Sequence, residues 1–166
     1  MQKDSILNII LVGVGLCIVC GAVISTVAVS LRDQQEQNVI FDQQSKIIDA
    51  ARLLEVYPSS QEALDSIEEV VVNLNDGQPS AFPPEQYDLD SILRDSSQHT
   101  VLNGSDDIAM INVRENLSKV YIEYRNNELK TLILPVRGYG LWGTLYGYLA
   151  LDSDLNTIVG LEFYKH

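Results

Sequence analysis

Cysteine and histidine are scarce in this chain, with two of each among its 166 residues. Cys17 and Cys20 could share one helical face, but two thiolates form an incomplete ligand set, and no histidine or acid lies nearby. His99 and His166 are isolated, so neither a Ser–His–Asp site nor a histidine-rich metal site can be assembled. We therefore predict no metal-binding residues and no catalytic residues. The part outside the apolar run has no cysteine, so the thiol content does not indicate a compartment.

Basic residues are also few, with 11 lysines and arginines against 23 acids and a net charge of −12. Residues 55–107 hold twelve acids and one base, whereas residues 108–166 hold six of each. Nucleic acid and anionic lipid both require clusters of Lys or Arg, so neither is an expected partner. No phosphate-binding glycine loop of the P-loop or dinucleotide kind occurs. The acidic segment is most simply a solvated face or a partly disordered insert.

One apolar run, Ser5 to Leu31, contains no charged side chain in 27 residues. As a helix it would be about 40 Å long, enough to cross a hydrocarbon core of about 30 Å with some tilt. The alternative is a cleaved secretory signal, for which Ala28-Val29-Ser30 offers a cleavage site. Because the run far exceeds the usual signal core of about 7 to 15 residues, we expect a retained anchor at 5–31 after a short tail at 1–4.

Small side chains recur every fourth residue within this run, at Gly13, Cys17, Gly21 and Ser25. Such a stripe lets a second helix approach closely in lipid, so it favours packing against other membrane subunits, although a chance stripe is the alternative. The lipid bilayer is the other expected partner. Lysine and arginine flank the run on both sides, so charge alone does not give the orientation of the anchor.

Residues 32–57 carry apolar side chains at helical spacing on a polar background, which predicts an amphipathic juxtamembrane helix that ends near Pro58. Residues 58–107 form the acidic, loop-rich segment. Within it, Ser59 or Ser60 can cap a short helix that includes Ile67. A short strand at Val70–Val72, a proline-rich loop and a short helix at 87–93 are expected to follow.

Residues 108–166 are rich in strand patterns. A hairpin is predicted from strands 119–125 and 129–134 around the turn Asn126-Asn127. Gly138-Tyr139-Gly140 is expected to break the chain before a strand at 142–151, a turn at 152–156 and a strand at 158–164. The predicted fold is α+β, a membrane helix followed by a mixed region and an antiparallel sheet. Since the sequence stops on a bare strand, we expect an incomplete domain.

The segment Gly138-Tyr139-Gly140-Leu141-Trp142 is the one candidate binding site. Glycines permit close backbone approach, and Leu141 and Trp142 offer flat apolar surface to an aromatic ring. The alternative is a turn with a tryptophan in the core.

Several motifs, in order and at both ends of the chain, resemble the C subunit of the sodium-translocating NADH:quinone oxidoreductase. They are Leu31-Arg32-Asp33-Gln34-Gln35, Asp42-Gln43-Gln44-Ser45-Lys46-Ile47-Ile48, Ile133-Leu134-Pro135-Val136-Arg137-Gly138-Tyr139-Gly140-Leu141-Trp142, Val159-Gly160-Leu161 and Phe163-Tyr164-Lys165-His166. Residues 58–115 match poorly. The resemblance implies an electron-carrying subunit of a sodium-pumping respiratory complex in the bacterial inner membrane, with ubiquinone as the acceptor of the complex. It also implies a single span and a soluble domain on the periplasmic side.

The resemblance further implies FMN, bound covalently through a threonine in a Ser-Gly-Ala-Thr type motif. No threonine here has that setting, and the Thr-Pro-Gly-Leu-Gly turn that follows the final histidine in the family is absent. We therefore expect a truncated FMN-binding-type domain that cannot attach FMN by itself. The expected cofactor-binding residues are Gly138, Gly140, Leu141 and Trp142. The alternative function is a single-span structural or scaffold protein, either pseudopilin-like or binding a partner protein.

Overall fold

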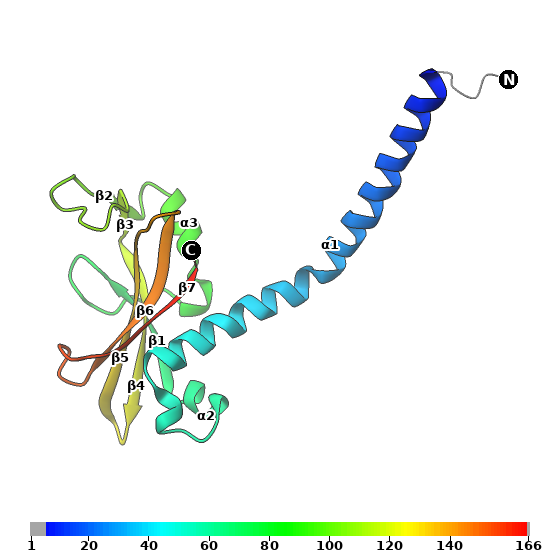
Figure 1. Cartoon of the computed structure of the whole chain (residues 1–166). Coiled ribbons are helices and arrows are strands. Elements are labelled where there is room, and N and C mark those ends of the chain that lie inside the picture. Colours follow the sequence, from blue (N-terminus) through cyan, green and yellow to red (C-terminus); the bar gives the residue numbers. More distant parts are fainter. Residues whose placement is uncertain (1–5, 166) are drawn as a thin grey trace. The chain divides into compact units, whose positions relative to one another are not determined.

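The computed structural model describes residues 6–165, with the side chains of 6, 7, 33 and 36 left aside. The predicted tail at 1–4 and His166 therefore lie outside the described residues. The chain divides into two compact units, one up to Phe41 and one from Asp42 onwards. Figure 1 shows the second unit as a curved sheet with short helices.

Helix α1 (Ile6–Ala50) contains the predicted anchor. Its segment Asn8–Arg32 has a mean hydropathy of 2.6 and no buried side chains, so by length and composition it can cross a membrane. The helix continues without interruption beyond Arg32, as expected, but it ends at Ala50 instead of near Pro58. Arg52 has a left-handed backbone (φ 51°), which reverses the chain and brings Leu53 of η1 (Leu53–Glu55) into the core. Burial of Leu53 thus ends the helix earlier than the pattern predicted.

The segment after α1 contains the predicted short helix, but this helix ends before Ile67. Ser59 caps α2 (Ser60–Asp65), since its hydroxyl accepts a hydrogen bond from the Glu62 amide at 3.3 Å. Ile67 was expected in this helix, but it opens strand β1 (Ile67–Asn73). It does so because Ile67 pairs with Glu123 across the sheet, a contact that helical spacing cannot reveal.

The main sheet is antiparallel, with the strand order β1-β4-β5-β6-β7. Its remaining strands are β4 (Leu117–Arg125), β5 (Glu128–Tyr139), β6 (Thr144–Asp152) and β7 (Ile158–Lys165). The predicted β4–β5 hairpin is confirmed, and both turn residues, Asn126 and Asn127, have positive φ, as a two-residue hairpin turn requires. The predicted break at Gly138-Tyr139 is wrong, since both residues belong to β5 and pair with β6.

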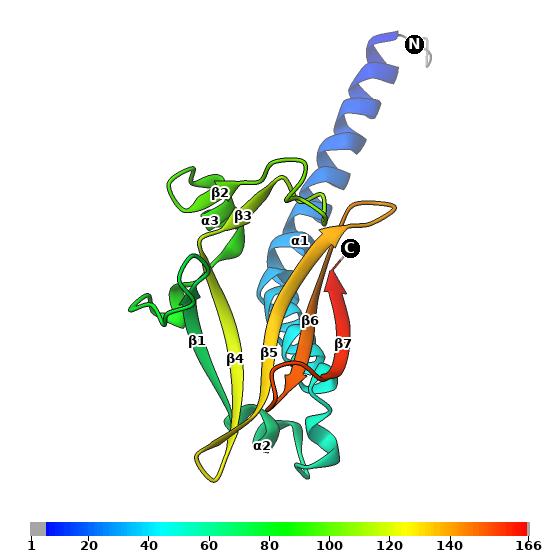
Figure 2. The ribbon, with the colours of Figure 1, turned by 90° about the vertical axis from the view of Figure 1, so that its left-hand side faces the viewer.

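Smaller elements complete the described part of the second unit. A two-stranded sheet joins β2 (His99–Val101) to β3 (Val113–Glu115). The predicted helix at 87–93 corresponds to α3 (Leu89–Arg94), which Asp88 caps, and η2 (Pro84–Gln86) precedes it. Figure 2 shows these pieces at the same end of the sheet as the β5–β6 turn.

The core lies between one face of the sheet and the last turns of α1. Ile47, Ile48 and Ala50 from the helix are buried against Ile133 and Ala150 from the central strands. Burial of side chains of this kind stabilises a fold by about 1.5 to 3 kcal/mol for each large apolar residue. The end of α1 is therefore part of the second unit and fixes its packing.

Candidate functional site

The predicted site residues lie at and just beyond the end of β5. Gly138 belongs to the strand, and Gly140 begins a tight turn in which its amide donates to the Gly143 carbonyl at 2.7 Å. Leu141 and Trp142 stand at the tip of this turn, with 88% and 93% of their surfaces exposed. The structure thus keeps the two apolar side chains in solvent, and the alternative of a core tryptophan is wrong.

A groove of about 280 Å³ lies beside this turn, lined by Val136, Arg137, Gly138, Tyr139, Leu145, Leu161 and Phe163. Of the four predicted site residues, Gly138 lines this groove, while Gly140, Leu141 and Trp142 do not. Leu145 approaches Gly140 so closely that a Cβ atom at position 140 would stand 2.9 Å from its Cγ atom. A side chain at position 140 would therefore force Leu145 to move.

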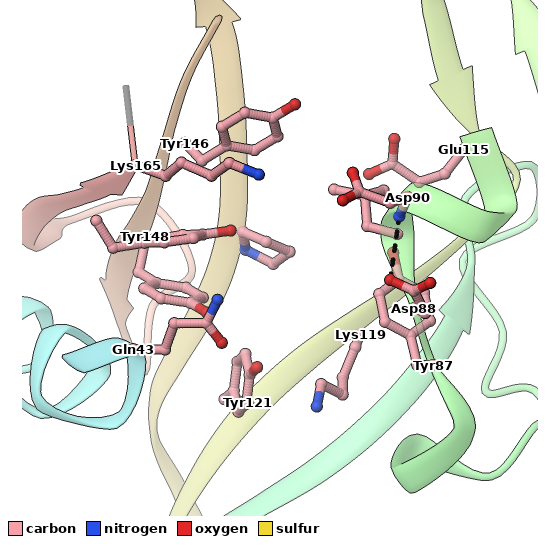
Figure 3. A pocket seen from close by; sticks show the side chains of 13 residues that line it. Gln43, Tyr87, Asp88, Asp90, Glu115, Lys119, Tyr121, Tyr146, Tyr148 and Lys165 are labelled. Atoms are coloured by element: carbon pink, nitrogen blue, oxygen red, sulfur yellow. Dashed lines mark hydrogen bonds between the residues drawn. The ribbon is translucent and has the colours of Figure 1, made fainter. Parts of the chain in front are cut away.

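A second cavity, of about 220 Å³, lies between α3 and the sheet and is rich in tyrosine. Figure 3 shows Tyr146, Tyr148 and Lys165 on one side, with Tyr87, Asp88, Asp90 and Glu115 on the other. Tyr148 stacks on Tyr164 with ring centroids 4.9 Å apart, and Tyr121 meets Tyr148 edge-on at 5.6 Å. This tyrosine cavity draws residues from α1, α3 and five strands, so the sequence did not predict it.

Four tyrosine hydroxyls of this cavity, those of Tyr87, Tyr121, Tyr148 and Tyr164, are hydrogen-bond donors rather than bases. Burial raises the pKa of Tyr87 to about 12, and the nearby Glu115 carboxylate also acts to raise it. Burial likewise raises the pKa values of Tyr121, Tyr148 and Tyr164 above the ordinary value for tyrosine. All four phenols are consequently protonated at neutral pH, and none can accept a proton as a general base.

An ion pair joins the two concave regions. Arg137, which lines the groove, donates to Glu115, which lines the tyrosine cavity, at 2.7 Å. The same guanidinium also donates to the Val113 carbonyl at 2.6 Å. Both charged side chains are nearly buried, so the pair holds β3 firmly against β5. Within residues 6–165, no three histidine, cysteine or acidic side chains are placed to hold a metal ion.

Comparison with known proteins identifies relatives along almost the whole chain. No protein-family model matches it. The C subunit of the Na(+)-translocating NADH-quinone reductase of Pseudomonas aeruginosa is 40% identical over 170 residues, which cover 99% of this chain and 65% of the relative. The corresponding subunit of Vibrio vulnificus is 36% identical, with coverages of 99% and 65%.

A solved structure agrees with these sequence relatives. The crystal structure of Shewanella oneidensis NqrC superimposes with a TM-score of 0.65 at 25% identity, covering 74% of this chain and 58% of that one. This chain thus spans about 65% of the length of the curated relatives it matches. By sequence and by fold, it is similar to NqrC, the C subunit of the Na(+)-translocating NADH-quinone reductases.

Proposed function

We propose that this chain acts as the membrane-anchored electron-transfer subunit of a sodium-pumping NADH:quinone reductase. The observation that carries the proposal is the extent of the match, since the similarity to the relatives runs over 99% of the chain and therefore includes both the anchor and the sheet. A helix able to span a membrane, joined to a folded unit, suits a carrier that must stay beside its partner subunits. The reaction catalysed by the complex would be NADH:quinone reduction.

The proposed location is the bacterial inner membrane, with a single span and the folded unit on the periplasmic side. The described anchor exposes Gly13, Cys17, Gly21 and Ser25 along its length. In lipid, helices associate through close packing of such small residues, so this stripe is the proposed contact with the other membrane subunits. The surrounding apolar side chains would face lipid.

FMN is the proposed cofactor of the complete protein, and the groove beside Gly138 fits its ring. The groove has a volume of about 280 Å³, and Leu145, Leu161 and Phe163 give it apolar walls. Arg137, the cation that lines the groove, is already paired with Glu115. The groove therefore suits the neutral ring of FMN better than its charged phosphate. FMN would supply one- and two-electron transfer, while Gly138 in the groove, together with Gly140, Leu141 and Trp142 in the adjoining turn, would position the ring.

Covalent attachment is not proposed for any residue of this chain. Its threonines are Thr26, Thr100, Thr131, Thr144 and Thr157, and none stands in a Ser-Gly-Ala-Thr setting. Thr131 is also buried, and its hydroxyl donates to Glu123 at 2.8 Å. The attachment threonine would have to come from sequence beyond these 166 residues.

The proposal is tested by purification from membranes. An affinity-tagged version of the chain is produced in a bacterium that retains the other reductase subunits but lacks its own NqrC. We expect the other subunits to co-purify in mild detergent, and we expect Gly13→Leu combined with Gly21→Leu to reduce their recovery. Ile10→Leu with Ile18→Leu is the matched control, because both positions are already large and apolar. A chain that purifies without those subunits would contradict the proposal and favour a scaffold role.

A further inference from the structure

The tyrosine cavity and the groove beside Gly138 lie on opposite faces of the main sheet. Tyr146 and Tyr164 line the cavity, whereas their chain neighbours Leu145 and Phe163 line the groove. Successive side chains of a strand point to opposite faces, so β6 and β7 serve both spaces at once. The tyrosine cavity is therefore separate from the proposed site of the flavin ring.

Three of the five charged side chains that line the cavity already have partners. Glu115 pairs with Arg137 at 2.7 Å, and Lys119 pairs with Glu69 at 3.0 Å. Asp88 caps α3, and its carboxylate accepts hydrogen bonds from amides in the first turn of that helix. The protein itself compensates these three charges, so none of them requires a ligand.

The other two charged side chains, Asp90 and Lys165, form no ion pair within residues 6–165. The Lys165 ammonium lies over the ring of Tyr146, 5.2 Å from its centroid, and this contact holds the cation at the cavity wall. Burial raises the pKa of Tyr164, and the Asp90 carboxylate adds to this shift, so Asp90 lies within electrostatic reach of that hydroxyl. Figure 3 shows Lys165 and Asp90 on opposite sides of the cavity, which thus has a positive and a negative pole.

Buried phenols add hydrogen-bond donors to the cavity. Tyr121 and Tyr148 are only 7% and 4% exposed, and the hydroxyls of Tyr121, Tyr148 and Tyr164 interact with one another. Burial raises the pKa values of all three, so each keeps its proton at neutral pH. Each hydroxyl of such a chain can donate to the next, and the last one requires an acceptor outside the chain. A carboxylate oxygen is an acceptor that suits these hydroxyls and the Lys165 ammonium together.

We propose that the tyrosine cavity binds a small zwitterion of the ω-amino acid class, with its carboxylate at Lys165 and the phenol hydroxyls and its ammonium at Asp90. The site goes beyond the proposed function and does not depend on it. An ω-amino acid carries its two charges at opposite ends, as the cavity does, whereas a ligand with one charge would leave one pole without a partner.

The size and the walls of the cavity fit the same class of ligand. Its volume of about 220 Å³ is smaller than the roughly 300 to 1,000 Å³ of sites for drug-sized molecules, so it suits a small metabolite. The rings of Tyr148 and Tyr164, stacked with centroids 4.9 Å apart, offer apolar surface to the methylene groups between the two charges.

Isothermal titration calorimetry of the full chain at pH 7, in a non-ionic detergent, tests the proposal. The probes are 4-aminobutanoate, 5-aminopentanoate and 6-aminohexanoate, compared with pentanoate and pentylamine, which carry one charge each. We expect at least one of the amino acids to bind saturably and at least tenfold more tightly than either singly charged compound.

Substitution of the two poles should change the preference in a charge-specific way. Lys165→Gln should weaken amino acid binding at least fivefold and remove the preference over pentylamine, while Asp90→Asn should remove the preference over pentanoate. Lys165→Arg keeps the positive charge and should keep the preference. Lys130→Gln and Glu128→Gln are the matched controls, because this surface ion pair does not line the cavity, and both should bind like the unaltered chain.

Three results would overturn the inference. The absence of saturable heat with every amino acid would show that the cavity is not a site for zwitterions. Equally tight binding of pentanoate or pentylamine would show that only one pole is used, and unchanged preferences in Lys165→Gln and Asp90→Asn would place the binding elsewhere. Circular dichroism of each variant separates loss of binding from loss of folding. Co-purification of the other reductase subunits involves no small ligand, so the proposed function can survive each of these results.

Discussion

Gly160 of β7 lies against the carbonyl oxygen of Ala50, the last residue of α1, with no room for a side chain between the two backbones. The end of α1 therefore packs on the sheet through direct contact between the backbones of Ala50 and Gly160. Ala50 itself is fully buried, as is Ala150 on the neighbouring strand. Small residues on both surfaces let the helix approach the sheet this closely.

Gly160→Ala should accordingly destabilise the folded unit. A Cβ atom at position 160 would overlap the Ala50 carbonyl, and backbone cannot move aside as a flexible side chain can. We expect a loss of about 1 to 3 kcal/mol or more in the free energy of unfolding, measured by urea denaturation of the full chain in detergent. Gly104→Ala is the control, since a Cβ atom there would meet nothing within 4 Å. Equal stability of the two variants would show that the contact is not tight.

Glu123 is fully buried, and Tyr57, Arg125 and Thr131 all donate hydrogen bonds to its carboxylate. Burial alone would raise the pKa of Glu123, but these hydrogen bonds outweigh it and lower the pKa below the ordinary value. Because the folded pKa is lowered, the carboxylate stabilises the fold above the ordinary pKa of about 4.3 and loses this effect as the pH falls through the folded value.

Glu123→Gln should therefore reduce stability by about 1 to 3 kcal/mol at pH 7, and this difference should shrink as the pH falls below about 4. Urea denaturation at several pH values measures both effects. Glu128→Gln provides the control, because Glu128 is exposed and its ion pair with Lys130 lies at the surface. A stability difference that does not depend on pH would mean that the charge of Glu123 has no part in the effect.

The tyrosine cavity should resist alkaline titration. The pKa values of Tyr87, Tyr121, Tyr148 and Tyr164 are raised in the fold, so their stabilising effect is present below the ordinary pKa of about 10 and is lost as the pH rises above it. We expect these phenols to ionise only as the protein unfolds, which absorbance at 295 nm and circular dichroism can follow together. In concentrated urea they should ionise near pH 10. Ionisation of all tyrosines near pH 10 with the fold intact would contradict this expectation.

The Arg137–Glu115 pair should show strong coupling in a double-mutant cycle. Removing one partner leaves the other charge buried, which costs about 3 to 5 kcal/mol, whereas replacing both with apolar residues costs less. Arg137→Met and Glu115→Leu, alone and together, should therefore be non-additive in urea denaturation. The exposed pair Lys130–Glu128 serves as the control and should give about 0 to 1 kcal/mol of coupling. Additive losses at Arg137 and Glu115 would show that the two side chains act independently.

The anchor should keep the intact chain in membranes washed with alkaline carbonate. Its apolar run favours insertion strongly, and a single arginine at the centre of a span costs about 2.5 to 3.5 kcal/mol. Val14→Arg combined with Val19→Arg should release the chain, while Val14→Leu with Val19→Leu should not. Immunoblotting of pellet and supernatant measures the distribution. Release of the unaltered chain, or a product shortened by the length of the span, would show that the helix is not a permanent anchor.

Local features were predicted well wherever a few adjacent residues carry the information. The Ser59 cap, the Asn126-Asn127 turn and the β4–β5 hairpin all follow from chemistry that acts over two to four residues. The end of α1 was predicted less well, because the burial of Leu53 and the reversal at Arg52 depend on a sheet formed much later in the chain.

The candidate site stays a prediction. Gly138, Gly140, Leu141 and Trp142 were recognised as a group, and the structure adds that Leu141 and Trp142 are exposed and that loop 106–112 rests beside them. That loop belongs to a stretch with poor resemblance to the family, and no short-range pattern relates Ala109 to Tyr139. The tyrosine cavity was missed for the same reason, since its rings come from three strands and from the segment just before α3.

The amino-acid order alone was enough to predict the long apolar helix, the β4–β5 hairpin and the similarity to NqrC, because hydrophobic length, turn residues and motif order can all be read along the chain. Only the tertiary structure shows which distant segments pack together. These are β1 with β4, Ala50 with Gly160, and loop 106–112 with the end of β5. Pairing between such distant segments is selected by burial and backbone hydrogen bonding across the whole sheet, whereas periodicity and turn chemistry act only between near neighbours.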